Sequence, residues 1–135
     1  MMGAQMLGMS QRCFDECVSY AKERKTFGKS LIEHQVIRHK LADMSAKIDA
    51  MDAYLNQVAQ LMNDGEKPVA EISKIKFYCS ECLESIASEA MQILGGAGYL
   101  RGNPVERIYR EVKVMSIGGG SKEIMRDLTI KQMGL

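Results

Sequence analysis

Hydrophobic residues recur every three or four positions along most of this chain, which is the spacing of helices that bury one side. The clearest case spans positions 37–62. Its apolar positions are Ile37, Leu41, Met44, Ile48, Met51, Leu55, Val58 and Met62. This pattern predicts a long helix with one continuous buried seam. Asp64-Gly65 is expected to cap that helix, and Pro68 to open the next one in its first turn.

The same spacing predicts further helices on both sides of this one. The preceding helix carries Met2, Met6, Met9, Cys13, Cys17 and Tyr20 on one side. The following helix carries Ile72, Ile75, Cys79, Cys82, Ile86, Ala90 and Ile93, and Gly95 and Gly96 end it. A short helix after Asn103-Pro104 presents Val105, Ile108, Val112 and Met115. The glycines at 118–120 break it, and a last helix is expected from about Ser121 to Met133.

Long helices with short connections predict an all-α fold, an up-and-down four-helix bundle. We expect the three long helices and the last helix to form the bundle, and the short helix after Pro104 to bridge it. No strand pattern, internal repeat or low-complexity tract is present.

Composition narrows the function classes. A chain of 135 residues with 46% hydrophobic positions is one domain with one core. Its 18 Lys and Arg against 17 Asp and Glu give a net charge of +1, which does not indicate nucleic acid or an anionic membrane as a partner. No stretch approaches the roughly 18 consecutive apolar residues that a spanning helix requires, so membrane insertion is not predicted.

The four cysteines could be read as a zinc site, because Cys13 and Cys17, and Cys79 and Cys82, form closely spaced pairs. Both pairs also fall within apolar helical stripes, where Cys packs as a small hydrophobic residue. Structural zinc sites usually take such pairs from turns. We therefore predict reduced core thiols and no metal site.

Three irregular junctions could hold a ligand: residues 24–29, 92–99 and 117–124. The first is basic, and from physics alone its cations are better explained as complements of a helix C-terminus than as an anion clamp. In the second, glycines would let the backbone approach a ligand or would only turn the chain. The third, a glycine-rich loop leading into a helix N-terminus, is the strongest candidate for an anion site.

Taken together, these junctions resemble the C-terminal helical domain of the acyl-CoA dehydrogenase family. Tyr20–Gly28 resembles the family's Y-A-x-x-R-x-x-F-G and is followed by His34-Gln35 and by Leu41–Met44. Gln92–Tyr99 resembles the family's Q-x-x-G-G-x-G-Y, and Pro104–Glu111 resembles its P-V-E-R-x-Y-R-D. Gly118–Arg126 resembles the family's last motif, E-G-T-x-x-I-x-R. The motifs agree in order and spacing over essentially the whole chain. The resemblance implies that residues 1–135 are one such domain, with the N-terminal helical and middle β domains outside this sequence.

The resemblance also implies a role for individual residues in binding FAD, which in the family lies between the β domain of one subunit and the C-terminal domains of that subunit and a neighbour. Arg24 would hold the FAD pyrophosphate and Phe27 would pack beside the cofactor. The adenosine-diphosphate half would contact His34, Gln35 and the backbone of Gln92, Ile93, Leu94, Gly95 and Gly96, partly across a subunit interface. Ser121, Lys122 and Glu123 would meet the flavin, and Gly120 would lie against the acyl thioester.

One position departs from the family's commonest pattern. Many members carry the catalytic base as the Glu of E-G-T, and this chain has Gly119 there, which cannot accept a proton. Members that act on isovaleryl-type and long-chain substrates place the base near the start of the first helix of this domain. That position falls just before Met1. No catalytic residue is therefore predicted within the chain, and the chain alone is expected to be inactive.

The implied reaction is α,β-dehydrogenation of an acyl-CoA thioester, with electrons leaving to an electron-transferring flavoprotein. The implied assembly is a homodimer or homotetramer. The implied compartment is the cytoplasm of a bacterium or the mitochondrial matrix of a eukaryote. Two alternatives stay open: an acyl-CoA oxidase or related flavoprotein, and a helical interaction module without catalysis.

Overall fold

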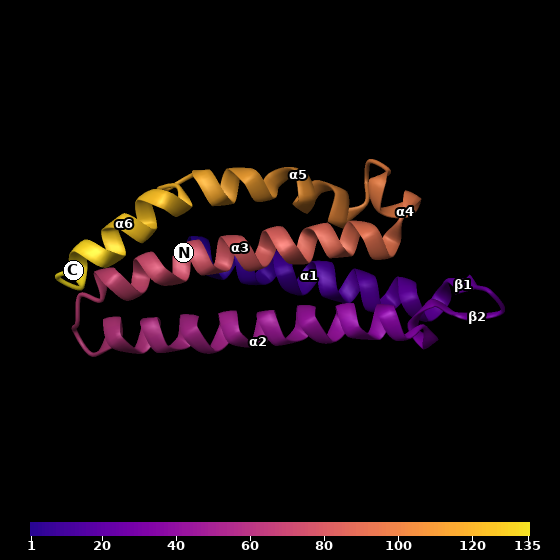
Figure 1. Cartoon of the computed structure of the whole chain (residues 1–135), viewed down its shortest axis with the longest axis horizontal. Coiled ribbons are helices and arrows are strands. Elements are labelled where there is room, and N and C mark those ends of the chain that lie inside the picture. Colours follow the sequence, from indigo (N-terminus) through magenta and orange to yellow (C-terminus); the bar gives the residue numbers. More distant parts are fainter.

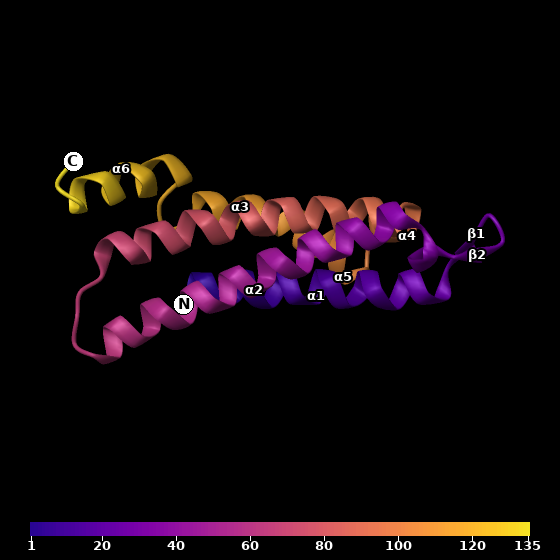
Figure 2. The same cartoon turned by 60° about the horizontal axis from the view of Figure 1, so that its bottom comes forward.

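Three long helices run side by side for most of the length of the molecule (Figure 1, Figure 2). The computed structural model describes the whole chain, residues 1–135. In chain order its elements are α1 (Met2–Glu23), β1 (Lys25–Thr26), β2 (Lys29–Ser30), the 3-10 helix η1 (Leu31–Glu33), α2 (Gln35–Asn63), α3 (Val69–Leu94), α4 (Gly96–Tyr99), α5 (Pro104–Ile117) and α6 (Lys122–Gln132). The predicted all-α fold is confirmed.

The fourth position of the bundle is shared by two helices. α5 and α6 follow one another along one side of the molecule, and both contact α3, while α5 also contacts α1 (Figure 1). The helix after Pro104, which was predicted to bridge the bundle, does so by packing against both α1 and α3. Its apolar residues Val105, Ile108 and Val112 are buried in the core. Neither short helix could cover α3 alone, because each is about half its length.

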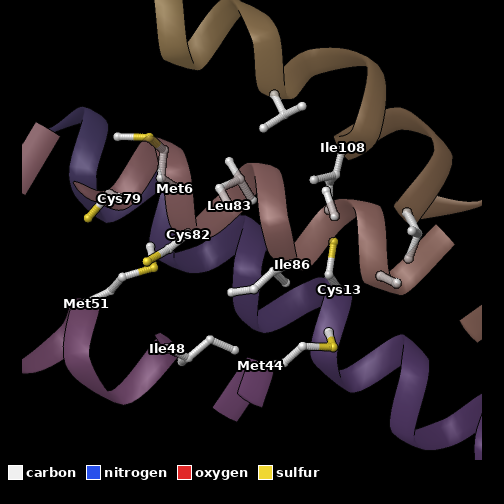
Figure 3. Packing of buried hydrophobic residues seen from close by; sticks show 14 of the residues in the cluster. Met6, Cys13, Met44, Ile48, Met51, Cys79, Cys82, Leu83, Ile86 and Ile108 are labelled. Atoms are coloured by element: carbon white, nitrogen blue, oxygen red, sulfur yellow. The ribbon is translucent and has the colours of Figure 1, made fainter. Parts of the chain in front are cut away.

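The core lies along α3, between α1, α2 and α5. Met6 and Cys13 from α1, Met44 and Met51 from α2, and Ile108 from α5 belong to one hydrophobic cluster with α3 (Figure 3). All four cysteines are buried and free, as their helical spacing predicts. Burial raises the pKa of Cys13, Cys17 and Cys79 to about 12, so these thiols stay protonated.

Three buried serines are satisfied within their own helices. The Oγ atoms of Ser10, Ser73 and Ser80 each donate to the carbonyl four residues earlier, at 2.8–2.9 Å. A serine that pairs in this way can replace alanine at a helix contact without leaving an unpaired polar group. These residues therefore serve packing and need no ligand to explain them.

A two-stranded hairpin joins α1 to η1, although no strand was predicted. Lys25 pairs with Ser30 and Thr26 with Lys29, in antiparallel register. Phe27 and Gly28 form the turn with φ angles of +50° and +80°, the signs that a tight hairpin turn requires. Two residues per strand are too few to produce an alternating pattern, so hydrophobic periodicity could not reveal them.

Most predicted helix boundaries agree with the structure. α2 ends at Asn63 with Asp64 as its cap, α3 begins directly after Pro68, and Ser121 caps α6. The glycines after Leu94 do end α3, but a one-turn helix, α4, follows them, and this element was not predicted. None of the helices combines the length and the apolar character needed to cross a membrane.

Candidate functional site

The three irregular junctions lie in two separate regions of the molecule. The hairpin and α4 are at the same end of the bundle in both views, so the structure brings the first two junctions to one end (Figure 1, Figure 2). The third junction, residues 117–124, lies on the flank between α5 and α6. There it meets the start of α1, since a Cβ added at Gly119 would be 2.7 Å from Met2 Sδ. We call these regions the hairpin end and the glycine loop.

At the hairpin end, cationic and aromatic side chains extend into solvent. Arg24 caps the C-terminus of α1 and is exposed, as are Lys25 and Lys29 on the two strands. Phe27 at the turn is 97% exposed, which is unusual for so large an apolar side chain. The backbone shape of this turn is held from within, because Leu31 N–H donates to Arg24 O at 2.7 Å and Ser30 N–H donates to Glu33 Oε2 at 2.6 Å.

His34 lies inside the base of the hairpin and is half-buried. Its Nε2 shares a hydrogen bond with Thr26 Oγ1 at 3.0 Å and lies 3.3 Å from Thr26 O. The Phe27 ring lies edge-on to the imidazole, with ring centroids 6.3 Å apart. His34 therefore orients the turn and Phe27, while its neighbour Gln35 is exposed at the start of α2.

The end of α3 contributes backbone and one amide to the same region. Gln92, Gly95 and Gly96 are exposed, whereas Ile93 and Leu94 are buried in the core. A ligand at this end could reach only the backbone of Ile93 and Leu94.

Asn103 holds the connection that follows. Its Nδ2 donates to Ala97 O at 3.2 Å, and its Oδ1 accepts from Val105 N–H at 2.8 Å. This side chain caps α5 and ties it to α4. The hairpin end is thus bordered by α4 and the start of α5, which the Asn103 side chain joins.

In the glycine loop, Gly119 and Gly120 have φ angles of +69° and +112°. These values favour glycine, because side chains at such angles clash with the backbone. Ser121 Oγ accepts from Ile124 N–H at 3.4 Å and begins α6. The loop therefore presents backbone groups next to a helix N-terminus, as the sequence predicted.

A buried lysine holds this loop from α3. Lys76 is 8% exposed, and its Nζ donates to Ser116 O at 3.2 Å and also to Gly120 O. Burial lowers the pKa of Lys76, while the nearby carboxylate of Glu123 opposes that shift. The ammonium is therefore bonded to one carbonyl before Gly118 and Gly119 and to one after them.

A carboxylate two turns further along α3 holds the flanking helices. Glu84 accepts from Lys113 at 2.5 Å and Ser116 at 3.1 Å through Oε1, and from Lys122 at 2.8 Å through Oε2. Although burial acts to raise it, these hydrogen bonds lower the pKa of Glu84 to about 2. Lys122, a predicted flavin contact, is thus committed to an ion pair with α3. Glu123 is exposed.

A groove of about 650 Å³ passes the glycine loop. It lies between the start of α1, the second half of α2 and the first half of α3, and most of its lining is apolar. Met2, Leu7, Leu55 and Ile75 belong to that lining, together with Gly119 and Lys76. An apolar cavity with few polar groups is typical of a small-molecule site.

Sequence reasoning missed three residues of the glycine loop's surroundings: Met2, Lys76 and Glu84. Lys76 was detectable in principle, because a lysine four residues after Ile72 and three before Cys79 falls on the apolar face of its helix. Glu84 and Met2 gave no such indication. Their roles depend on contacts with residues far away in the chain, which helical spacing alone does not define.

The chain was compared with known proteins. Residues 1–134 match the family model described as acyl-CoA dehydrogenase, C-terminal domain. The chain is 38% identical to the caffeyl-CoA reductase–Etf complex subunit CarC of Acetobacterium woodii, covering 91% of this chain and 32% of that protein. It is 37% identical to cyclohexane-1-carbonyl-CoA dehydrogenase of Geobacter metallireducens, covering 92% and 33%.

Solved structures agree with these relatives. A probable acyl-CoA dehydrogenase from Mycobacterium abscessus superimposes with a TM-score of 0.96 at 39% identity, covering 98% of this chain and 35% of that one. The chain thus spans about a third of the length of the proteins that it matches. The similarity covers both the hairpin end and the glycine loop.

Proposed function

Because the chain belongs to the acyl-CoA dehydrogenase family, we propose that it is the C-terminal domain of an FAD-dependent enzyme that dehydrogenates acyl-CoA thioesters between Cα and Cβ. The observation that carries this proposal is the family match over residues 1–134. In the complete enzyme the domain supplies FAD contacts and part of an oligomer interface. Its two candidate regions have different duties, one toward the adenosine-diphosphate half of FAD and one toward the flavin and the thioester.

The residues at the hairpin end fit a dinucleotide. Arg24, Lys25 and Lys29 are exposed cations in one short segment, which is the chemistry that a pyrophosphate requires. The guanidinium of Arg24 offers paired donors for two phosphate oxygens. Phe27 presents an apolar ring beside these charges, and the exposed amide of Gln92 and backbone of Gly95 can take the polar edges of the adenosine. A ligand held by such protruding groups is completed by a second surface, which supports a homodimer or homotetramer.

The glycine loop fits the reactive end of the cofactor. Bound FAD supplies the hydride acceptor of the reaction. Ser121, Lys122 and Glu123 begin α6 beside the loop, and Gly120 offers a backbone close to the thioester. The apolar groove that passes Gly119 suits an acyl chain, because burying each methylene stabilises the complex by about 0.8 kcal/mol.

The proton acceptor is proposed to lie outside this chain, on the residue position just before Met1. Gly119, at the family's common base position, has no side chain. Met2 instead reaches this place, since its Sδ lies 2.7 Å from where a Cβ of Gly119 would be. A residue directly preceding Met1 in the complete enzyme is therefore near the same groove. This arrangement supports a base on the first helix rather than on the loop.

The electron partner proposed is an electron-transferring flavoprotein. The relative CarC is named as a subunit of a reductase–Etf complex. That name also favours a second candidate, in which the enzyme works in the direction of reduction and adds hydrogen to an unsaturated acyl-CoA. The same flavin and the same groove serve both directions. A dehydrogenase and a reductase of this kind therefore differ in the reduction potentials of their electron partner and substrate rather than in these residues.

The test is to produce the complete protein and to measure its flavin and its reaction with acyl-CoA thioesters of different length and branching. We expect about one FAD per chain, and bleaching of the flavin under anaerobic conditions by at least one saturated acyl-CoA. Bleaching only by a reduced electron donor, followed by recolouring with an enoyl-CoA, would favour the reductase. Rapid recolouring by oxygen would favour an oxidase. Protein without flavin that binds no acyl-CoA would overturn the proposal in favour of a non-catalytic module.

A further inference from the structure

We propose that Lys76 is a positioning residue that sets the shape of the glycine loop for catalysis; this inference rests on the proposed function. The ammonium of Lys76 donates to Ser116 O at 3.2 Å and to Gly120 O. These two carbonyls lie on opposite sides of Gly118 and Gly119. One buried cation thus joins the two ends of the segment that faces flavin and thioester.

The loop needs such support because glycine gives the chain little preference for one conformation. Three consecutive glycines at 118–120 lose more conformational entropy on ordering than any other triplet. Within the loop, the backbone bond from Gly118 N–H to Val114 O, at 2.7 Å, only ends α5. The bonds from Lys76 reach backbone carbonyls on both sides of Gly118 and Gly119 from another element, α3.

A lysine at this buried position destabilises the fold unless its ammonium is hydrogen-bonded, as it is to the glycine loop. Lys76 lies between Ile75 and Cys79 on the buried side of α3, and taking an ammonium out of water is unfavourable. The carbonyl oxygens of Ser116 and Gly120 compensate for the loss of water around the ammonium. The nearby carboxylate of Glu123 also acts to raise the pKa of Lys76. An apolar side chain of similar length would fill the same space without that cost, but it would leave both carbonyls of the loop unbound.

Glu84 supports the same loop from outside. It lies eight residues after Lys76, on the same side of α3, and holds Ser116 and Lys122, which flank the loop. Lys76 acts on the backbone of the loop and Glu84 on its two neighbouring helices. The effect of Lys76 on the shape of the loop can therefore be tested separately from the packing of α5 and α6 on α3.

The experiment compares Lys76→Met with Ser80→Ala in the complete enzyme. Ser80 is fully buried one turn further along α3, and its hydroxyl donates to Lys76 O at 2.8 Å without contacting the loop, so it controls for loss of a buried polar group. We expect Lys76→Met to keep FAD, because the hairpin end is unchanged, and to slow flavin bleaching by acyl-CoA at least tenfold. A misplaced reacting group commonly costs up to about a hundredfold. We expect a fall in kcat with little change in KM, and a wild-type rate for Ser80→Ala.

A second measurement does not require catalysis. In the 135-residue chain, amide hydrogen exchange at Gly118 and Met125 reports on the two sides of the loop, since both amides are hydrogen-bonded there. We expect exchange at both sites to be at least tenfold faster in Lys76→Met and unchanged in Ser80→Ala. If Lys76→Met does not fold, Lys76→Gln is judged by the same criteria, because it keeps the length of the stem and removes the charge.

The outcomes are distinct. A flavin-loaded Lys76 variant with a wild-type rate of bleaching, or unchanged exchange at Gly118 and Met125, would overturn the role of Lys76. Wild-type protein that binds neither FAD nor acyl-CoA would instead overturn the proposed function. In that case the exchange measurement alone decides whether Lys76 orders the loop.

Discussion

At the scale of single residues, Arg24 carries a charge that the fold itself does not use. Its side chain is exposed and makes no ion pair, although its backbone caps α1. We expect Arg24→Ala in the complete enzyme to weaken FAD retention ten- to a hundredfold, because a charge-assisted contact to phosphate contributes about 1.5–3 kcal/mol. The melting temperature should change little. Flavin content after dilution measures the effect. Lys22→Ala is the control, because it removes another exposed cation from the last turn of α1. Unchanged flavin occupancy would count against a phosphate contact.

Gly119 and Gly120 differ in how much a side chain would disturb them. A Cβ at either position meets the flexible side chain of a methionine, Met2 for Gly119 and Met125 for Gly120, but the φ of +112° at Gly120 lies further than +69° from the values that other residues adopt. We expect Gly119→Glu to destabilise the chain by about 1–3 kcal/mol through its φ of +69°. Adding Met2→Ala should recover the part that comes from the contact. Gly120→Ala should be worse than Gly119→Ala.

Chemical denaturation of the four variants measures these differences. Positions 119 and 2 also test where the catalytic base can lie. In a complete enzyme that has lost its upstream acid, Gly119→Glu with Met2→Ala should restore part of the flavin bleaching. A variant that holds flavin but stays inactive would show that the two base positions are not interchangeable. Equal stability of Gly119→Ala and Gly120→Ala would contradict the conformational argument.

Residue-level prediction succeeded where a local pattern carries the information. Helical spacing identified most of the core, and Ser121 was recognised as the start of the last helix. It failed for Lys76 and Glu84, because their partners lie 29 to 44 residues away along the chain. The roles assigned to Arg24, Phe27 and Ser121 toward FAD come from resemblance and stay predictions.

At the scale of elements, Glu84 joins α3 to both α5 and α6. Its pKa of about 2 in the fold lies below its ordinary value of about 4.5. A carboxyl with a lowered pKa stabilises the fold above its ordinary value, and this contribution is lost as the pH falls toward about 2. We expect Glu84→Gln to cost about 1–2 kcal/mol at neutral pH, a value reduced for screening because the side chain is 20% exposed. The difference from wild type should shrink as the pH falls from about 5.

Glu81→Gln is the matched control for this prediction. Glu81 pairs with Arg126 of α6 from the preceding turn of α3, but both side chains are more than 40% exposed. Surface pairs contribute roughly 0–1 kcal/mol and are screened by salt. Urea denaturation at several pH values measures both variants. A pH-independent loss in Glu84→Gln would show that the hydrogen bonds, and not the charge, are responsible.

The elements that sequence reasoning missed or described incompletely are the short ones. The helix after Pro104 was expected to bridge the bundle, and the structure adds that it packs on both α3 and α1. The hairpin at Lys25–Ser30 and the single turn of α4 are too brief for periodicity to register. Both are formed by turn residues, with positive φ at Phe27 and Gly28 in the hairpin.

At the scale of the whole molecule, the two candidate regions lie apart on one helical bundle. The hairpin projects from one end of the bundle, and the glycine loop lies on the flank near the start of α1 (Figure 1). The long helices between them fix their separation, since α1 and α3 share one continuous core. A cofactor that met both regions of a single domain would have to follow the outside of the bundle. Two copies of the domain, each offering one region, give a simpler arrangement.

This arrangement leads to a prediction for the 135-residue chain by itself: it should not retain FAD through gel filtration, and it should be colourless. Tight sites for small molecules enclose most of the ligand's surface. At the hairpin end, Phe27 is 97% exposed and the cations around it face solvent, so pyrophosphate there would stay hydrated and screened. At the glycine loop, backbone groups and Ser121 offer hydrogen bonds on one side only. Each region supplies a fraction of the contacts, and binding must first offset the loss of translational freedom of the ligand.

The measurement is the flavin absorbance of purified chain after incubation with excess FAD and gel filtration, beside the complete enzyme treated in the same way. We expect flavin to stay with the complete enzyme and to separate from the chain. Circular dichroism should show that the chain is helical, so that loss of flavin is not loss of fold. Stoichiometric flavin on the folded chain would contradict the division of the site between surfaces. It would mean that the hairpin end of one chain and the glycine loop of another already meet without the remaining domains, and the chain would then elute as an oligomer.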